Sequence, residues 1–500
     1  MKKRPLKGMI SIASVALLGG LVGFGGAPRP SATHLSETLT VQLQANTGTA
    51  SSKQNKVLVQ ETQQWEKLHP EVTVKFLPNP YTTTTDSNAA LVTEASAHRA
   101  PDLVWEQYGA TSSGAIPQGI LMNLMPYLQK PNPYVAGNKK WLNLWEPIAK
   151  AYMVTNGKAD VLLGSDLATE IVYNKADFKK AGITSTPRTW QQFIVDLKKL
   201  KADHFAPFMF TDATGGCNPS WFERKFMSEL LHSEINRFDV NHSQVADGLD
   251  TAVGIERGVI SMKNPAYAEG WKLLGQLRPY LAAGSSSYSA CANVTATAAP
   301  LSQLIPFTQN KYAMVWSGTW HVPDLDALGF SGKFGMFPFP TITTATTRYS
   351  SDLNLTGVVG GPNGVGEWSV TTPAANSSMT PTTKKLVINY LQYLYAPKNE
   401  GRWVADAGSG SFIPVIKGAE YKSAAGVTNL FSKKKPPVTI DGVLDGQLSA
   451  SSQSQAIRIL QAYLGNNLSW AQFASEWNAM LQQTATAWAQ ANHVNLAKYK

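Results

Sequence analysis

Tryptophans beside polar side chains are the feature of this 500-residue sequence that could bind a ligand. Fourteen tryptophans occur, and several neighbour a carboxylate, hydroxyl or imidazole: Trp105-Glu106, Trp221 with Glu223, Trp316-Ser317, Trp320-His321 and Glu367-Trp368. Indole faces stack on the apolar faces of sugar rings, while carboxylates and amides hydrogen-bond to sugar hydroxyls. The pattern therefore favours a carbohydrate site. Core packing is the ordinary role of any one tryptophan, and Trp65 and Trp190 fit the core faces of predicted helices.

Motifs of the common enzyme classes are missing from the sequence. It contains no G-x-x-x-x-G-K-[ST] phosphate loop, no H-E-x-x-H zinc motif and no G-x-S-x-G nucleophile elbow. The eight histidines are widely spaced, and only two cysteines are present. We therefore expect a binding protein rather than an enzyme, with no catalytic residues, no metal and no cofactor.

The composition limits the class of protein. Hydrophobic residues make up 43% of the chain and charged residues 16%, which excludes a disordered chain, a coiled coil and a multi-span membrane protein. The net charge is +10; four basic residues lie within the first seven, so the rest carries +6. The remaining basic residues are dispersed pairs and not a stripe, which argues against a nucleic-acid partner.

The N-terminal segment has the order of a secretory signal. Basic residues within 2–7 precede an apolar stretch from Met9 to Phe24, and small residues follow it. We expect residues 1–26 to be a signal peptide or a membrane anchor, and residues 27–37 to be a spacer. Export permits a disulfide between Cys217 and Cys291, and two free thiols are the alternative.

Hydrophobic periodicity predicts an α/β protein. Alternating strands at 39–43, 72–76 and 103–105 are separated by helical stretches, and this order implies a parallel sheet. Further strands are predicted at 171–175, 312–316 and 335–339. Thr189 and Gln192 form a capping box that begins a helix. The tail from 453 to 488 is predicted to be mostly helical.

Several stretches, in order, resemble the extracellular solute-binding proteins of sugar-importing ABC transporters, the family that includes maltose-binding protein. The most specific is the sequence from Tyr173 to Gly182 followed by Pro187-Arg-Thr-Trp-Gln-Gln-Phe193. Other matching stretches are 65–74, Pro101-Asp-Leu-Val-Trp105, Ala313-Met-Val-Trp-Ser-Gly-Thr-Trp320, and 391–397 with Asn399-Glu400 and the loop 408–414. The resemblance covers about residues 38–500.

The resemblance implies a two-lobed periplasmic-binding-protein fold of type II. Each lobe would be a mixed, mostly parallel sheet flanked by helices, with lobe one taking 38–165 and 366–430 and lobe two 166–365 and 431–500. A sugar would bind in the cleft, the hinge would close, and the monomeric protein would dock on an ABC permease. The family's usual lipid-anchoring cysteine is missing, since the first cysteine is Cys217. We therefore expect a cell-surface, periplasmic or secreted protein.

Candidate ligand-binding residues follow the ends of predicted strands, where doubly wound sheets bind ligands. The resemblance assigns Trp320 as the stacking residue. The other candidates are Asn46, Thr47, Glu106, Gln107, Asp212, Trp221, Glu367, Trp368 and Phe412.

Three alternatives remain open at this point. A secreted carbohydrate-active enzyme would need a pair of essential carboxylates. The same fold could bind a polyol, a glycerol phosphate or a peptide, although the site-like loops carry few of the basic residues that a phosphate needs. A surface adhesion protein would not close on a small molecule.

Overall fold

The structure of the protein is a computed structural model. It describes residues 36–43, 49–79, 84–105, 119–154, 157–166, 168–212, 217–240, 242, 245–287, 303–353, 367–406, 412–421, 439–440, 442–445 and 448–500. The predicted export segment and residues 27–35 of the spacer lie outside these ranges. Within the ranges, none of the helices combines the length and apolar composition that crossing a membrane requires.

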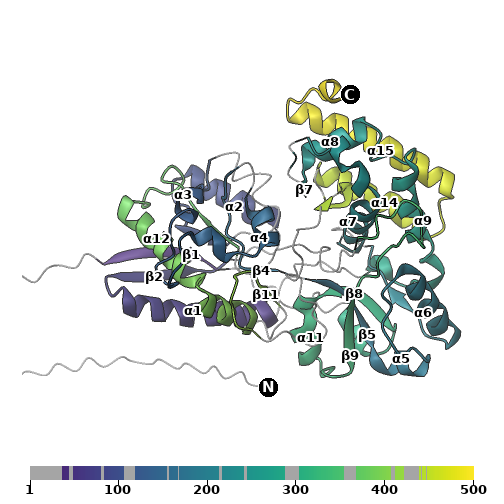
Figure 1. Ribbon diagram of the computed structural model, residues 1–500, viewed down its shortest axis with the longest axis horizontal. Coiled ribbons are helices and arrows are strands. Elements are labelled where there is room, and N and C mark those ends of the chain that lie inside the picture. The colour runs from purple at the N-terminus through teal and green to yellow at the C-terminus, as the bar shows by residue number, and fades with distance from the viewer. Residues whose placement is uncertain are drawn as a thin grey trace, which may run out of the picture. The chain divides into compact units, whose positions relative to one another are not determined.

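The first sheet is mostly parallel, as predicted. Its strands lie in the order β10 (Trp368–Val370), β3 (Leu103–Trp105), β1 (Glu37–Gln42) and β2 (Val72–Leu77). Strand β1 pairs in parallel with β2 and β3, and β10 is antiparallel to β3. Helices α1 (Thr49–Leu68) and α2 (Thr84–Ser96) connect the three parallel strands, which confirms the predicted strand–helix alternation (Figure 1).

One buried carboxylate fastens this sheet. Asp102 Oδ2 accepts hydrogen bonds from the backbone N–H and the hydroxyl of Thr40, each at 2.7 Å, and Asn376 donates to Oδ1 at 2.7 Å. A carboxylate that accepts several hydrogen bonds away from water is strongly anchored. Asp102 therefore supports a β1–β3 pairing in which only Val41 and Leu103 are directly in register.

The second sheet is mixed, as predicted, although antiparallel pairings outnumber parallel ones in it. Its order is β6 (Phe208–Met209), β8 (Met314–Gly318), β5 (Thr169–Asn174) and β9 (Phe334–Pro338). Strand β5 is antiparallel to both β8 and β9, and only β6 and β8 are parallel. The alternation of side chains locates a strand but carries no information on its direction.

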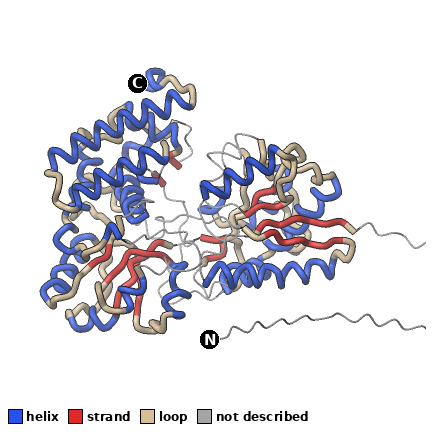
Figure 2. The backbone as a smooth tube through the Cα atoms, turned by 180° about the vertical axis from the view of Figure 1, so that it is seen from behind, coloured by secondary structure: helices blue, strands red, loops and turns tan. Residues whose placement is uncertain are grey.

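Helices flank the strands of both sheets (Figure 2). Those after β3 and around β10 are α3 (Met125–Leu128), α4 (Pro147–Met153), α12 (Pro381–Leu394) and α13 (Pro397–Glu400). Those after β5 are α5 (Lys175–Lys180), α6 (Trp190–Ala202), α7 (Cys217–Leu230), α8 (Gly248–Glu256), α9 (Pro265–Gly275), α10 (Leu304–Thr308), α11 (Val322–Ala327), α14 (Ala450–Leu464) and α15 (Trp470–Ala491). The predicted capping box of Thr189 and Gln192 begins α6, and the predicted helical tail is two helices.

Two short ladders complete the strands of the described chain. Strand β4 (Ser165–Asp166) pairs antiparallel with β11 (Ile413–Pro414), and β7 (Val245–Ala246) pairs in parallel with β12 (Thr439–Ile440). Each ladder joins segments that lie far apart in the sequence. The ladders thereby fix residues 413–414 against 165–166 and residues 439–440 against 245–246.

The two largest hydrophobic cores each take residues from two separate stretches of the chain. The core of the first sheet, here core one, draws on residues between 39 and 163 and between 368 and 416. Core two, on one face of the second sheet, draws on residues between 171 and 342 and between 440 and 485. Trp65 and Trp190 are fully buried in cores one and two respectively, which confirms their predicted packing role.

Candidate functional site

Trp320 lies on a short turn that follows β8. The strand ends at Gly318, a single 3₁₀ turn spans Thr319–His321, and α11 follows directly. The six-membered part of the Trp320 indole lies against Gly318: a Cβ atom at Gly318 would lie 1.9 Å from Cζ3 of Trp320. A residue without a side chain is therefore required for the ring to occupy this position.

Trp320 contacts both large cores. Among the half-buried apolar side chains in the described residues, it alone packs against core one and core two together. Its ring meets that of Trp221, from α7, edge to face with centroids 5.7 Å apart. Trp221 in turn contacts Trp316, which stacks on Phe339 at 4.1 Å. A continuous aromatic stack therefore supports Trp320 from the side of core two.

Burial separates Trp320 from most of the other tryptophans. Eleven of the fourteen are buried, and only Trp320, Trp470 and Trp488 are half-buried. Trp470 packs beside Tyr463, and the Lys272 ammonium lies over its ring. Of the predicted ligand-binding tryptophans, Trp320 is thus the one whose ring keeps a substantial exposed part in this conformation.

Asp212 lies three residues after the end of β6 and is 2% exposed. Its Oδ1 accepts a hydrogen bond from the hydroxyl of Ser286 at 2.8 Å. Burial raises the pKa of this carboxyl above its usual range, and the hydrogen bonds from the serines oppose that rise. The group is a buried hydrogen-bond acceptor shortly after a strand that the sequence did not predict.

Three other candidates lie in or beside core one. Trp368 is 1% exposed and pairs with Trp105 across β10 and β3. Phe412 is buried immediately before β11, and Glu367 is buried immediately before β10. The described conformation therefore presents none of these three side chains openly to solvent.

Glu223, which follows Trp221 by two residues in the sequence, has a structural role. Its carboxylate accepts hydrogen bonds from Leu444 N–H at 2.9 Å and from the Tyr267 hydroxyl at 3.3 Å. A Cβ at Gly442 would lie 2.1 Å from the Glu223 carboxyl carbon. Glu223 therefore fastens the segment around residue 443 to α7.

The remaining candidates lie outside the described residues. They are Asn46, Thr47, Glu106, Gln107 and Cys291. Cys217 begins α7, but its side chain is outside the description, so the disulfide remains a prediction.

Sequence reasoning missed the polar contacts that hold the turn of Trp320. Ser317 Oγ lies 2.6 Å from His321 Nδ1, and Thr319 N–H donates to Ala168 O at 2.9 Å. Burial lowers the pKa of His321 to about 3, so its imidazole is neutral. The adjacency of Trp320 and His321 was visible in the sequence, but the partner on the preceding strand was not.

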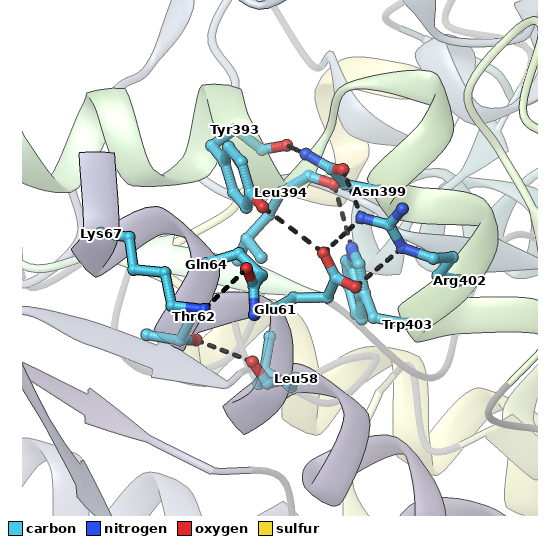
Figure 3. A network of polar contacts seen from close by, with 10 residues as sticks. All are labelled: Leu58, Glu61, Thr62, Gln64, Lys67, Tyr393, Leu394, Asn399, Arg402 and Trp403. Carbon is cyan, nitrogen blue, oxygen red and sulfur yellow. Dashed lines mark hydrogen bonds and ion pairs between the residues drawn. The ribbon is translucent and has the colours of Figure 1, made fainter. Parts of the chain in front are cut away.

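A second polar network holds the segment that leads to Phe412. Arg402, in the π-helix Gly401–Asp406, donates to both oxygens of Glu61 on α1, at 2.7 and 2.6 Å (Figure 3). Glu400 accepts a hydrogen bond from Val415 N–H at 2.9 Å. These contacts anchor described residues on either side of 407–411, which lie outside the described ranges.

Metal chemistry has no support in the described ranges. No group of three or more His, Cys, Asp or Glu side chains lies close enough there to hold a metal ion. The buried Ser317–His321 pair is also unsuited to attack on a solute, since Ser317 is fully buried. The candidates offer stacking, from Trp320 beside Trp221, and hydrogen bonding, from Asp212.

Solved structures of similar fold support this description. A chitin oligosaccharide binding protein has a TM-score of 0.61 and 17% identity, over 90% of this chain and 99% of its own. A probable secreted solute-binding lipoprotein from Streptomyces coelicolor has a TM-score of 0.61 and 15% identity, over 89% and 98%. The apo form of RafE from Streptococcus pneumoniae has a TM-score of 0.60 and 17% identity, over 92% and 100%.

At these identities the likeness shows the fold, which is that of solute-binding proteins. Among curated proteins, none matches the chain in sequence. The family model described as "Bacterial extracellular solute-binding protein" matches residues 49–401, well over half of the chain. That family consists of solute receptors and not of enzymes, in keeping with the missing catalytic motifs. The chain belongs to the bacterial extracellular solute-binding proteins, family 1.

Proposed function

We propose that this protein is the extracytoplasmic receptor of an ABC importer, and that it binds a sugar or oligosaccharide whose ring stacks on Trp320. One observation carries the proposal: Trp320 is the half-buried side chain, among those described, that contacts both large cores. A ligand on this ring would touch two parts of the protein at once. Closure of two lobes over a ligand needs such a contact.

The names of structural neighbours support a carbohydrate as the ligand. Among proteins of this fold are a chitin oligosaccharide binding protein, RafE in complex with raffinose, and GacH in complex with acarbose. All three ligands are carbohydrates with several rings. A neutral sugar suits a site built from indole rings and buried carboxyl groups.

We assign roles in the site by residue. Trp320 stacks on the sugar, Trp221 supports it edge-on, and Asp212 accepts a hydrogen bond from a hydroxyl. Glu367, Trp368 and Phe412 back the site from core one. The loop residues Asn46, Thr47, Glu106 and Gln107 supply further polar contacts.

The wider arrangement is part of the same proposal. Lobe one comprises 38–165 and 366–430, and lobe two comprises 166–365 and 431–500. The protein is exported by residues 1–26 and acts as a monomer at the cell surface, in a periplasm or as a secreted protein. It delivers its sugar to a membrane permease.

Thermal unfolding against a panel of sugars tests the proposal. The panel contains raffinose, chitotriose, acarbose, maltotriose and their monosaccharides. A sugar that binds only the folded state stabilises it by RT ln(1 + [L]/Kd), about 2.7 kcal/mol at 100 times Kd. We expect at least one sugar to raise the midpoint with concentration and to be recovered intact.

The control is a matched tryptophan. Trp320→Ala should abolish the shift, whereas Trp470→Ala, which removes another half-buried indole packed against core two, should retain it. If no sugar shifts the midpoint, the carbohydrate proposal fails. Recovery of cleaved sugar would show an enzyme instead.

A further inference from the structure

The turn that carries Trp320 is closed by a buried side-chain hydrogen bond. Ser317 is the penultimate residue of β8, and His321 ends the 3₁₀ turn; Ser317 Oγ and His321 Nδ1 lie 2.6 Å apart. The two residues stand on either side of Trp320 in the chain. Their exposed fractions are 0% and 6%. The bond is therefore shielded from water, where a polar pair is costly to break.

The imidazole in this bond has a fixed charge state. Burial lowers the pKa of His321 to about 3, so the ring is neutral across the ordinary pH range. One ring nitrogen of a neutral imidazole carries a proton and donates a hydrogen bond, and the other nitrogen accepts a hydrogen bond. Either tautomer at Nδ1 pairs with a serine hydroxyl, which both donates and accepts. A side chain without a hydrogen-bonding atom at that position would leave Ser317 without this partner.

The middle of the turn is bonded to a distant segment. Thr319 N–H donates to Ala168 O at 2.9 Å, and Ala168 N–H donates to Thr319 Oγ1 at 3.4 Å. Ala168 lies between β4 and β5 and packs with Ile413 of β11 in a small buried cluster. The β4–β11 ladder thus lies next to the residue that holds the turn.

We propose that Ser317 and His321 are positioning residues for Trp320: their hydrogen bond closes the turn 317–321, Thr319 ties that turn to Ala168, and the indole ring is thereby held in its ligand-stacking position. This inference rests on the proposed function for the role of Trp320. It assigns no ligand contact to Ser317 or His321. Their effect on binding is exerted through the placement of the ring.

A direct readout of the ring tests the proposal. The protein is labelled with 5-fluorotryptophan, and the ¹⁹F resonance of Trp320 is identified by its loss in Trp320→Phe. We expect Ser317→Ala and His321→Leu to shift and broaden that resonance. His321→Asn, whose amide reaches the position of Nδ1, should restore much of the native resonance.

Ser350→Ala is the matched control. The Ser350 hydroxyl is buried, donates to Ile342 O at 2.6 Å and accepts from Asp352 N–H at 3.0 Å, so this variant also loses the hydrogen bonds of a buried serine. It should lower the unfolding midpoint at least as much as Ser317→Ala does while leaving the Trp320 resonance unchanged. A merely structural role for Ser317 would make the two variants alike in both measurements.

Binding gives the second measurement. With the sugar that stabilises the wild type, Ser317→Ala should weaken affinity about three- to ten-fold, the effect of one hydrogen bond, and Ser350→Ala should not change it. An unaltered Trp320 resonance in both Ser317→Ala and His321→Leu would overturn the inference, even if sugars bind. If no sugar binds the wild type, the proposed function fails, and the ¹⁹F spectra still decide whether this pair holds the ring.

Discussion

Replacing Gly318 by alanine should displace the Trp320 ring without straining the backbone. Gly318 has φ −150° and ψ 171°, an extended conformation open to any residue. The added Cβ would lie 1.9, 2.2 and 2.3 Å from Cζ3, Cη2 and Cε3 of Trp320. Ordinary carbon contacts are about 3.5 Å or longer, so the ring must move by about 1.5 Å. Because the backbone at Gly318 is unstrained, the indole ring is the group that is displaced.

Gly318→Ala should reduce the stability of the fold less than it reduces the affinity for the sugar. Overpacking typically costs about 1–3 kcal/mol, and we expect the low end because Trp320 is half-buried and can turn toward solvent. The loss in binding should be larger. A ring displaced by more than 1 Å no longer stacks on the sugar, and a loss of about 1.4 kcal/mol or more is at least ten-fold in Kd.

A double-mutant cycle tests whether Gly318→Ala weakens binding by displacing the Trp320 ring. Gly318→Ala, Trp320→Ala and the double variant are titrated calorimetrically with the sugar found in the unfolding panel. Because Trp320→Ala removes the atoms that the new methyl would meet, the double variant should bind as weakly as Trp320→Ala and no more weakly. The coupling free energy should therefore nearly equal the whole effect of Gly318→Ala.

Gly335→Ala is the control for overpacking. Its Cβ would lie 2.5 Å from Cε1 and Cζ of Tyr173, in the same sheet but beside another ring. It should lower the unfolding midpoint and leave affinity unchanged. Additive losses in the cycle, or full affinity in Gly318→Ala, would refute the reasoning that this glycine exists to admit the indole.

Three further predictions concern buried polar groups of the described chain. Gly442→Ala places a methyl carbon 2.1 Å from the carboxyl carbon of Glu223. It should lower the free energy of unfolding, measured in urea, by about 1–3 kcal/mol. An unchanged midpoint would mean that residues near 443 are not fastened to α7. Arg402→Leu leaves Glu61 without its bidentate partner and should lower the free energy of unfolding by about 1–3 kcal/mol. This loss should exceed that of Glu61→Gln, and the reverse order would contradict the pairing. His321 has a folded pKa of about 3 against about 6.5 unfolded, so the unfolded chain binds the proton first and stability is lost as pH falls below about 6.5. Between pH 7.5 and 5 the wild type should therefore lose about 2 kcal/mol more than His321→Asn, and parallel pH curves for the two would show that the imidazole is not buried.

Hydrophobic periodicity and capping residues predicted several strands and helices well. Alternation in 39–43 and 72–76 corresponds to β1 and β2, and the Thr189 capping box begins α6. The direction of β5 could not be predicted, because both parallel and antiparallel strands alternate with the same period. The β4–β11 ladder is two residues long and carries no pattern at all.

The candidate site was harder to predict because adjacency in sequence says little about exposure. Trp316, Trp320 and Trp368 all stand beside polar residues, yet two of them are buried in the cores. A strand places alternate residues on opposite faces, so Trp316 and its polar neighbour Ser317 point apart. Trp320 differs because it follows the end of β8, where the chain turns and leaves the sheet.

Buried carboxylates explain the remaining difference between sequence and structure. Asp102, Glu223, Glu229 and Glu400 are each fully or nearly fully buried, and each accepts a backbone N–H from a distant segment: Thr40, Leu444, Ile342 and Val415 respectively. A backbone donor that has left a sheet or helix still needs an acceptor, and a carboxylate supplies a strong one. A fold whose chain repeatedly returns between two cores has many such donors. An acid near a tryptophan in this sequence is therefore as readily an anchor for a returning segment as a ligand for a sugar. Asp212 accepts a hydrogen bond from the Ser286 hydroxyl, as Asp102 does from Thr40 and Glu223 from Tyr267, and a sugar hydroxyl is a donor of the same kind.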